Sequence, residues 1–340
     1  MIELNELRDA AQKAFPADQL VPDRDKSWEL IAEMGWLMVR TSEDAGGLGL
    51  GRDATTAIHL EMGRVLSGAP VLPALLAIEA IGASETLADQ ADWIERTCAG
   101  EFVTLNLARG TVEQTADGSL SGTLPAVPDA DMASHVLLCI RGLATLVPLD
   151  AAGVMVSERE IWDRSRRLFE VTLNDYQPDP ALLVAKGGKA HDIAMHLQEE
   201  LLLGIAADCL GGANAALDMT VEYLKTRKQF DRPLAMFQAL KHRCADLKAR
   251  IGSAEALLWS RSGNAAATAT DLGALKTLAG EVYEFVTEEA IQLHGGIGLT
   301  EEHQCHLFMK RAMLNLVLGG TPDEWHEAAG RQALAEIAGA

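Results

Sequence analysis

The stretch Tyr223–Lys241, YLKTRKQFDRPLAMFQALK, predicts two helices joined by a tight turn. An amphipathic run, Leu210–Lys225, forms the first helix. Pro233 has no backbone N–H to donate, so we expect no helix to run through it. A second helix is expected to begin near Met236, because apolar residues recur beyond it at helical spacing: Phe237, Leu240, Cys244, Leu247 and Ile251.

The corner between these helices is cationic, with Arg227 followed by Lys228. Such a corner can bind phosphate through guanidinium and backbone N–H groups. Taken alone, the corner is better explained as a solvated basic loop on an ordinary helical bundle, because charged loops usually belong to the surface. A second stretch, Gln292–Gly298 (QLHGGIG), lies between helices expected over Leu275–Ile291 and His303–Leu318.

Composition limits the classes of partner. The 340 residues are 48% hydrophobic and only 5% aromatic, which favours a helical fold with a sizeable core. The formal net charge of −20 argues against nucleic acid and anionic membrane as partners. It does not exclude an anionic ligand, because a local basic pocket can lie in an acidic protein.

Cysteine usage and the N-terminal residues point to the cytoplasm. Five scattered cysteines with no CxxC pair predict reduced thiols. The start, MIELNELRDAAQ, is too polar for a signal peptide. The longest apolar run, Leu201–Gly212, is short and contains Asp208, so we expect no membrane span.

In chain order, helical patterns come first. Trp28–Trp36 has helical spacing that stops at Gly35, and a glycine-rich turn, Ser42–Gly51, lacks the residues of a phosphate-binding loop. A helix is expected from Asp53 to Val65, with Asp53 as its N-cap.

After about residue 100 the pattern changes to short strands. Asp117-Gly118 predicts a hairpin turn. The strands are expected over Phe102–Ala108, His135–Ile140, Ala144–Val147 and Phe169–Leu173. A linker containing Pro178 and Pro180 leads to a long helix over Ala190–Leu210 and the last helical region.

Together these motifs resemble the acyl-CoA dehydrogenase family. The resemblance rests on R-K-x-F…Q-A from Arg227, on Q-x-x-G-G-x-G from Gln292, and on W-x-x-I-A-E-M-G-W, G-G-L-G-L and E-M-G-R in the first hundred residues. It implies a mainly α fold with a small β-domain: an N-terminal helical domain (1–99), a reduced middle β-domain (100–180) and a C-terminal four-helix bundle (181–340). Trp162–Arg167, WDRSRR, resembles the segment that closes the family's β-domain.

The resemblance also implies a reaction. A flavin takes a hydride from the β-carbon of an acyl-CoA thioester, while a glutamate takes the α-proton. In the family, the ADP end of FAD is held by the neighbouring subunit. The matching residues are Arg227, Phe230, Gln238, Gln292, Gly295 and Gly296, called the ADP-end residues below. One departure is Asp231, where the family usually has glycine.

The family's two flavin-ring segments are not recognisable. After Ala108 the chain passes through Arg109–Thr111 directly into a hairpin, and Ala126–Asp129 replaces the second segment. Pro128 stands where a hydroxyl and an amide face the flavin in the family, and proline has neither group. Divergence with retained flavin binding is the alternative interpretation.

The family's base is missing as well. Gly319, before Gly320-Thr321, occupies the position of the usual glutamate. Some members carry the base near the position of Leu201, and Glu200 is the remaining candidate, although one helical step turns a side chain by about 100°. Asp323 and Glu324 are expected to begin the next helix.

No metal site is expected. His303, Cys305 and His306 do not converge on a tetrahedral site at helical spacing. His294 can either touch the cofactor or cap a helix end.

The resemblance is nearest to the short, non-catalytic subunits of heterotetrameric bacterial acyl-CoA dehydrogenases that act on steroid side chains. It implies a chain inactive alone, in a 2+2 heterotetramer with a catalytic acyl-CoA dehydrogenase subunit, sharing FAD and an acyl-CoA substrate at the interface. Two alternatives remain: a self-sufficient dehydrogenase with a relocated base, and a flavin-free scaffold or acyl-CoA-binding protein.

Overall fold

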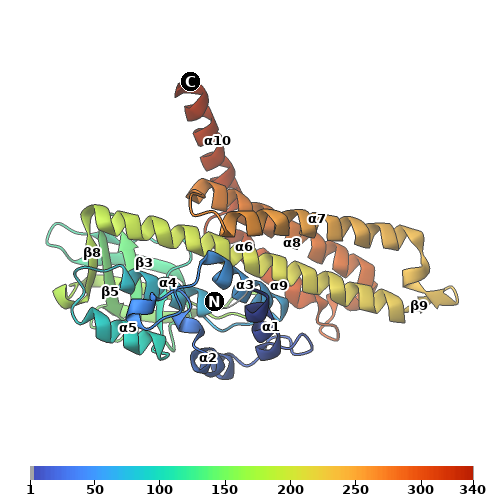
Figure 1. Ribbon diagram of the computed structural model, residues 1–340, viewed down its shortest axis with the longest axis horizontal. Coiled ribbons are helices and arrows are strands. Elements are labelled where there is room, and N and C mark those ends of the chain that lie inside the picture. The colour runs from blue at the N-terminus through green and yellow to red at the C-terminus, as the bar shows by residue number, and fades with distance from the viewer. Residues whose placement is uncertain (1–3, 340) are drawn as a thin grey trace. The chain divides into compact units, whose positions relative to one another are not determined.

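Helices, then strands, then helices follow one another along the chain (Figure 1). The computed structural model describes residues 4–339. Their order confirms the predicted fold class, mainly α with a small β-region. By internal contacts the described residues form two compact units. Unit 1 holds the chain up to Pro22, Thr56–Ser67 and the chain from Leu202 on; unit 2 holds Asp23–Thr55 and Gly68–Leu201. The three domain boundaries stay a prediction.

The first part of the chain is helical, with two 3-10 turns. The α2 helix ends at Glu33 because Gly35 adopts φ 69°, a left-handed conformation. The elements are α1 (Leu4–Ala14), α2 (Arg24–Glu33), η1 (Trp36–Met38), η2 (Glu43–Ala45), α3 (Arg52–Arg64), α4 (Val71–Gly82) and α5 (Gln90–Cys98).

The expected N-cap of α3 is wrong. The helix begins at Arg52, so Asp53 lies within its first turn. The Asp53 carboxylate accepts the N–H of its neighbour Ala54 at 3.0 Å. The residue still serves the helix, because a negative charge in the first turn is favourable to the helix dipole.

Eight strands of unit 2 form two four-stranded sheets that share one hydrophobic core. One sheet has the order β1-β4-β5-β8, with β1 parallel to β4; the other is antiparallel in the order β2-β3-β7-β6. The Asp117-Gly118 turn joins β2 to β3, as predicted. The strands are β1 (Val103–Leu105), β2 (Glu113–Gln114), β3 (Leu120–Pro128), β4 (His135–Ile140), β5 (Leu143–Pro148), β6 (Val154–Arg159), β7 (Leu168–Tyr176) and β8 (Leu183–Lys186).

The last part is helical except for one small hairpin. Helices α7 and α9 both pack on α8 (Figure 1). The elements are η3 (Pro180–Leu182), α6 (Gly187–Thr226), β9 (Lys228–Gln229), β10 (Arg232–Pro233), η4 (Leu234–Met236), α7 (Gln238–Ser262), α8 (Ala269–His294), η5 (Gly295–Leu299), α9 (Cys305–Val317) and α10 (Pro322–Gly339).

The helix α6 is continuous, whereas the sequence predicted two runs meeting at Leu210. Gly211 and Gly212 cause no break, because they serve close packing. A Cβ at Gly211 would overlap the Leu60 carbonyl of α3, and one at Gly212 would overlap the Tyr283 ring. By length and composition α6 could cross a membrane, but 94% of its apolar window is buried in the structure, as in a core helix.

Candidate functional site

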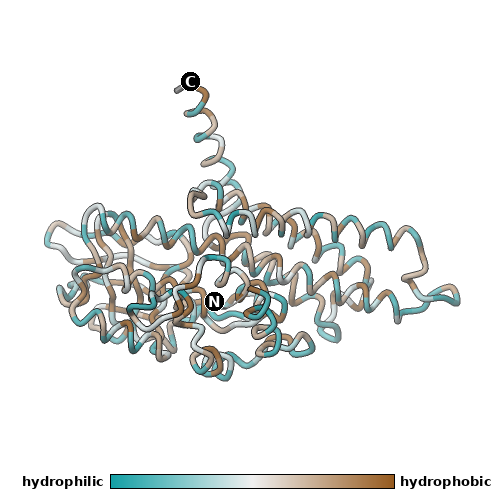
Figure 2. The backbone as a smooth tube through the Cα atoms, viewed as in Figure 1, coloured by the Kyte–Doolittle hydropathy of each residue, from teal (hydrophilic) through white to brown (hydrophobic). Residues whose placement is uncertain are grey.

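The β9–β10 hairpin of unit 1 presents the first group of ADP-end residues. Its loop consists of Phe230 and Asp231, both left-handed with φ 54° and 61°. This matches the type I′ turn that two-residue hairpin loops prefer. Aspartate tolerates this conformation better than most residues, which explains how the chain does without the family's glycine. Phe230 is 84% exposed at the tip of this hairpin. The backbone tube of the hairpin is coloured as mainly hydrophilic in Figure 2.

Arg227, directly before β9, offers a guanidinium that is available to a ligand. It is exposed, and its guanidinium has no side-chain partner among residues 4–339. By contrast, the Arg232 guanidinium lies 4.1 Å from the centre of the Phe237 ring. Gln238, the first residue of α7, is also exposed. The hairpin therefore offers one free guanidinium and one free amide.

The turn after α8 presents the second group. Gln292, Gly295 and Gly296 are all exposed, and Gly295 has φ 65°, which favours glycine. A Cβ built on either glycine would meet no atom within 4 Å. The backbone here is thus open to a close approach by a ligand.

Tyr223 holds these two groups together, which the sequence did not predict. Its hydroxyl donates to the His294 carbonyl at 3.3 Å, and its ring stacks on the His294 ring with centroids 4.4 Å apart. The end of α6, before the hairpin, is thereby fixed to the end of α8, before the glycine turn. An aromatic residue near a helix end carries no distinctive signal in sequence.

In unit 2, the segment that is predicted to replace the family's ring-binding residues, Ala126–Asp129, has its backbone groups hydrogen-bonded within the chain. Thr104 donates to the Pro128 carbonyl at 2.7 Å, and the Asp129 N–H donates to the Arg167 carbonyl at 3.2 Å. The Ala126 N–H is bonded to the Asn106 side chain. These groups are not available to a flavin ring without rearrangement.

An ion cluster completes this segment. Arg24 pairs with Asp129 at 2.9 Å and with Asp131 at 3.1 Å, and Arg167 also contacts Asp131. Burial raises the pKa of the Asp129 carboxyl to about 6, despite the neighbouring Arg24. The residues here therefore bind one another and do not fit a flavin ring.

Two side chains close the loop at the predicted base position, Gly319. Gly319 and Gly320 have φ 69° and 104°. The Trp325 indole donates to the Gly319 carbonyl at 3.0 Å, and the fully buried Lys276 donates to the carbonyls of Leu316 and Gly320 at 2.7 Å each. Burial lowers the Lys276 pKa to about 8. As expected, Asp323 and Glu324 lie in the first turn of α10.

Glu200 lies between two arginines of unit 2. Its carboxylate is 2.5 Å from Arg52 and 3.4 Å from Arg40, and it is 6% exposed. Nearby, Glu79 pairs with Arg40 and with His196. Both guanidinium groups donate to the Glu200 carboxylate, so its oxygens are already engaged and are not free to approach a substrate carbon.

Two family models match the chain. "Acyl-CoA dehydrogenase, N-terminal domain" matches residues 4–101, and "Acyl-CoA dehydrogenase, C-terminal domain" matches residues 193–333. Among curated proteins, the acyl-CoA dehydrogenase IpdE2 of Mycobacterium tuberculosis is 33% identical over 303 residues, covering 87% of this chain and 83% of that protein. IpdE2 of Mycolicibacterium smegmatis is 31% identical over 304 residues, covering 87% and 84%.

Solved structures show the same fold. A structure described as "Tcur3481-Tcur3483 steroid ACAD G363A variant" superposes with a TM-score of 0.86 at 28% identity, covering 99% of each chain. Butyryl-CoA dehydrogenase from Megasphaera elsdenii superposes with a TM-score of 0.83 at 20% identity, covering 98% of this chain and 99% of that one.

Proposed function

We propose a role for this chain from one premise: it belongs to the acyl-CoA dehydrogenase family, whose members are FAD-dependent oxidoreductases. The role is that of a non-catalytic subunit in a heteromeric acyl-CoA dehydrogenase. The partner subunit binds the flavin ring and carries the base, and this chain holds the ADP end of the partner's FAD.

The observation that carries the proposal is the closed loop at Gly319. It offers no side chain that could accept the α-proton, and Lys276 and Trp325 hold it in a left-handed conformation that glutamate disfavours. An acyl-CoA dehydrogenase needs a base at the substrate α-carbon. The closed loop therefore supports an inactive centre in this chain.

The ADP-end residues fit the part of a cofactor site that holds the ADP end of FAD. Arg227 would pair with the pyrophosphate, and the open backbone at Gly295 and Gly296 would approach it closely, while Gln238 and Gln292 would donate hydrogen bonds. When bound, FAD supplies the acceptor for the substrate's hydride. This chain's contribution is to orient the cofactor through contacts far from the reacting atoms.

One relative supports the substrate class and the assembly that we propose. The structure that is 28% identical is described as a steroid acyl-CoA dehydrogenase, and its name joins two components. We extend both properties to this chain: a bulky steroid side-chain acyl-CoA as substrate, and a 2+2 heterotetramer in the cytoplasm.

A self-sufficient enzyme is the second candidate, with Glu200 as its base. The two arginines around Glu200 argue against it. The substitution Glu200→Gln in the assembled enzyme separates the two. Unchanged turnover removes Glu200 as the base, whereas a loss of about 100-fold or more in a complex that still assembles would support it.

The main test is the flavin content of the chain purified alone and co-purified with a catalytic partner. We expect no flavin alone and one flavin per pair of chains in the complex. One flavin per chain in the protein alone would overturn the proposal.

A variant pair tests the contact itself. Arg227→Ala should lower the flavin occupancy of the complex, because a charge-assisted contact is worth about 1.5–3 kcal/mol, or roughly 10- to 100-fold in affinity. Lys225→Ala is the matched control, since its ammonium is paired with Glu222 at 2.6 Å. Equal occupancy in both variants would favour a flavin-free scaffold.

A further inference from the structure

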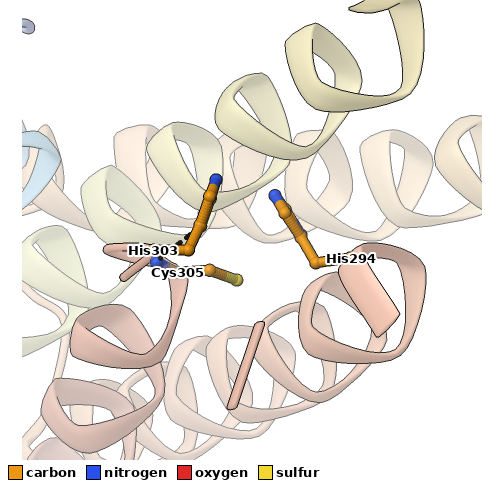
Figure 3. A group of neighbouring side chains, drawn as sticks. All are labelled: His294, His303 and Cys305. Carbon is orange, nitrogen blue, oxygen red and sulfur yellow. Dashed lines mark hydrogen bonds between the residues drawn. The ribbon is translucent and has the colours of Figure 1, made fainter. Parts of the chain in front are cut away.

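Three potential metal ligands meet beside the glycine turn of unit 1. They are His294, the last residue of α8, His303, in the loop after η5, and Cys305, the first residue of α9. One ligand atom from each lies within 4.8 Å of the other two. Figure 3 shows the two imidazole rings facing one another, with the Cys305 sulfur pointing into the gap between them. From this geometry we propose that His294, His303 and Cys305 bind a divalent cation of the zinc class.

The strongest support is the orientation of His294. Its Nδ1 donates to the Ala290 carbonyl at 2.7 Å, so Nε2 carries a free lone pair. This Nε2 atom is buried and has no hydrogen-bond partner within residues 4–339, and the whole residue is 4% exposed. In a metal-binding histidine, the ring nitrogen that does not bind the metal usually donates its N–H to a carbonyl, a carboxylate or a water. A metal ion would satisfy an acceptor that is otherwise left unpaired.

The other two ligands complete a set suited to zinc. One thiolate and two imidazoles match the borderline-soft character of Zn²⁺ and Co²⁺, and three protein ligands leave one position open. A thiol binds a metal as the thiolate, so Cys305, which is fully buried, has to release its proton to solvent as the metal–sulfur bond forms. Bond lengths of about 2.0–2.3 Å place tetrahedral ligand atoms roughly 3.3–3.6 Å apart. Because the three atoms lie within 4.8 Å of one another, each pair has to close by at most about 1.5 Å.

His303 has to change tautomer. Its Nδ1 accepts the Cys305 backbone N–H over 3.2 Å, the dashed line in Figure 3, so Nε2 carries the proton in the structure. Coordination through Nε2 requires the ring to give up this long contact and hold the proton on Nδ1. Tyr223 stacks on His294 and touches His303 edge-on, which limits both rings to small movements.

A second cluster with suitable residue types does not qualify. Glu79, His196 and Glu200 also bring one ligand atom each within 4.8 Å. However, Arg40 pairs with both carboxylates and Arg52 pairs with Glu200. These guanidinium groups already occupy the carboxylate oxygens and repel a cation. Among the three ligands beside the glycine turn, no arginine or lysine ion pair is present.

The inference goes beyond the proposed function, because it does not require the chain to bind flavin. The test is a titration of the full-length chain, freed of metal by a chelator, with Co²⁺. We expect saturation at one Co²⁺ per chain with a thiolate-to-cobalt charge-transfer band, and its loss when Zn²⁺ displaces Co²⁺. A wild-type chain without such a band would overturn the proposal.

Two variants assign the site. Cys305→Ser should abolish the band and lower Co²⁺ affinity by about 100-fold or more. Cys244→Ser, which changes a partly buried thiol of α7, should leave both unchanged. A band that persists in Cys305→Ser would show that another thiol binds the metal. If Cys305→Ser does not fold, His294→Gln decides: undiminished Co²⁺ affinity in that variant would equally contradict the site.

Discussion

Lys276 provides a sharp test of the closed loop at Gly319. Its ammonium is fully buried and donates to the carbonyls of Leu316 and Gly320. Hydrogen bonds from a charged donor contribute about 1.5–3 kcal/mol each. Burial opposes them: it lowers the pKa from 10.5 to about 8, which corresponds to about 3.4 kcal/mol. At pH 7 these terms nearly cancel, so Lys276→Met should lower the free energy of unfolding by only about 0–2 kcal/mol.

The pH dependence is the diagnostic measurement. Between pH 8 and 10.5 the unfolded chain holds the Lys276 proton and the folded chain releases it, so stability rises with pH. The neutral amine still has two N–H groups for the two carbonyls. From pH 7 to pH 9 the wild type should gain about 1.3 kcal/mol relative to Lys276→Met. Urea unfolding of both proteins at several pH values measures this difference, and parallel curves would refute the reasoning.

Two further predictions concern packing and ion pairing. Gly211→Ala should destabilise the fold by about 1–3 kcal/mol, because the added methyl overlaps the Leu60 carbonyl. The matched control is Gly252→Ala in α7, where the added methyl meets open space, and it should stabilise the fold by about 0.5–1 kcal/mol. Thermal melts of both variants measure the two effects. Equal changes in melting temperature would contradict the packing argument. The hydrogen bond to Glu79 raises the pKa of His196 in the folded chain. The stability that this bond contributes is therefore complete below the pKa of the unfolded chain, near 6.5, and is lost as the pH rises through the pKa of the folded chain. The stability difference between wild type and His196→Gln should therefore be larger at acidic than at alkaline pH in urea titrations, and a constant difference would oppose it.

Local features were predictable from the sequence. Pro233 cannot continue a helix, and the structure has a turn and a short strand there. Asp117-Gly118 forms a hairpin because glycine accepts φ 90°. Strand β6 was missed, because most of its residues, Val154–Arg159, are exposed and show no apolar alternation. In each case the outcome depends on a few neighbouring residues.

Features that depend on distant residues were not predictable. Gly211-Gly212 is a helix breaker by propensity, and only the approach of α3 and Tyr283 explains its place inside α6. The arginines around Glu200 come from positions about 150 residues earlier in the chain. The sequence grouped His303 and Cys305 with His306. In the structure they lie beside His294 instead, because η5 turns the chain back onto α8. The ADP-end residues and the empty base position stay predictions from the resemblance.

The closed loop at Gly319 also bears on how easily such a chain could change in evolution. Glycine and glutamate codons can differ by a single nucleotide, so the acidic residue is mutationally close. Structurally it is distant. A side chain at φ 69° costs about 1–2 kcal/mol. The Trp325 indole already donates to the Gly319 carbonyl, and the Lys276 ammonium already donates to the Gly320 carbonyl. A glutamate at this position would therefore need accompanying changes in the contacts of Trp325 and Lys276. On the proposed function, a chain with this loop depends on a partner for the base, and a single substitution at Gly319 is not enough to end that dependence.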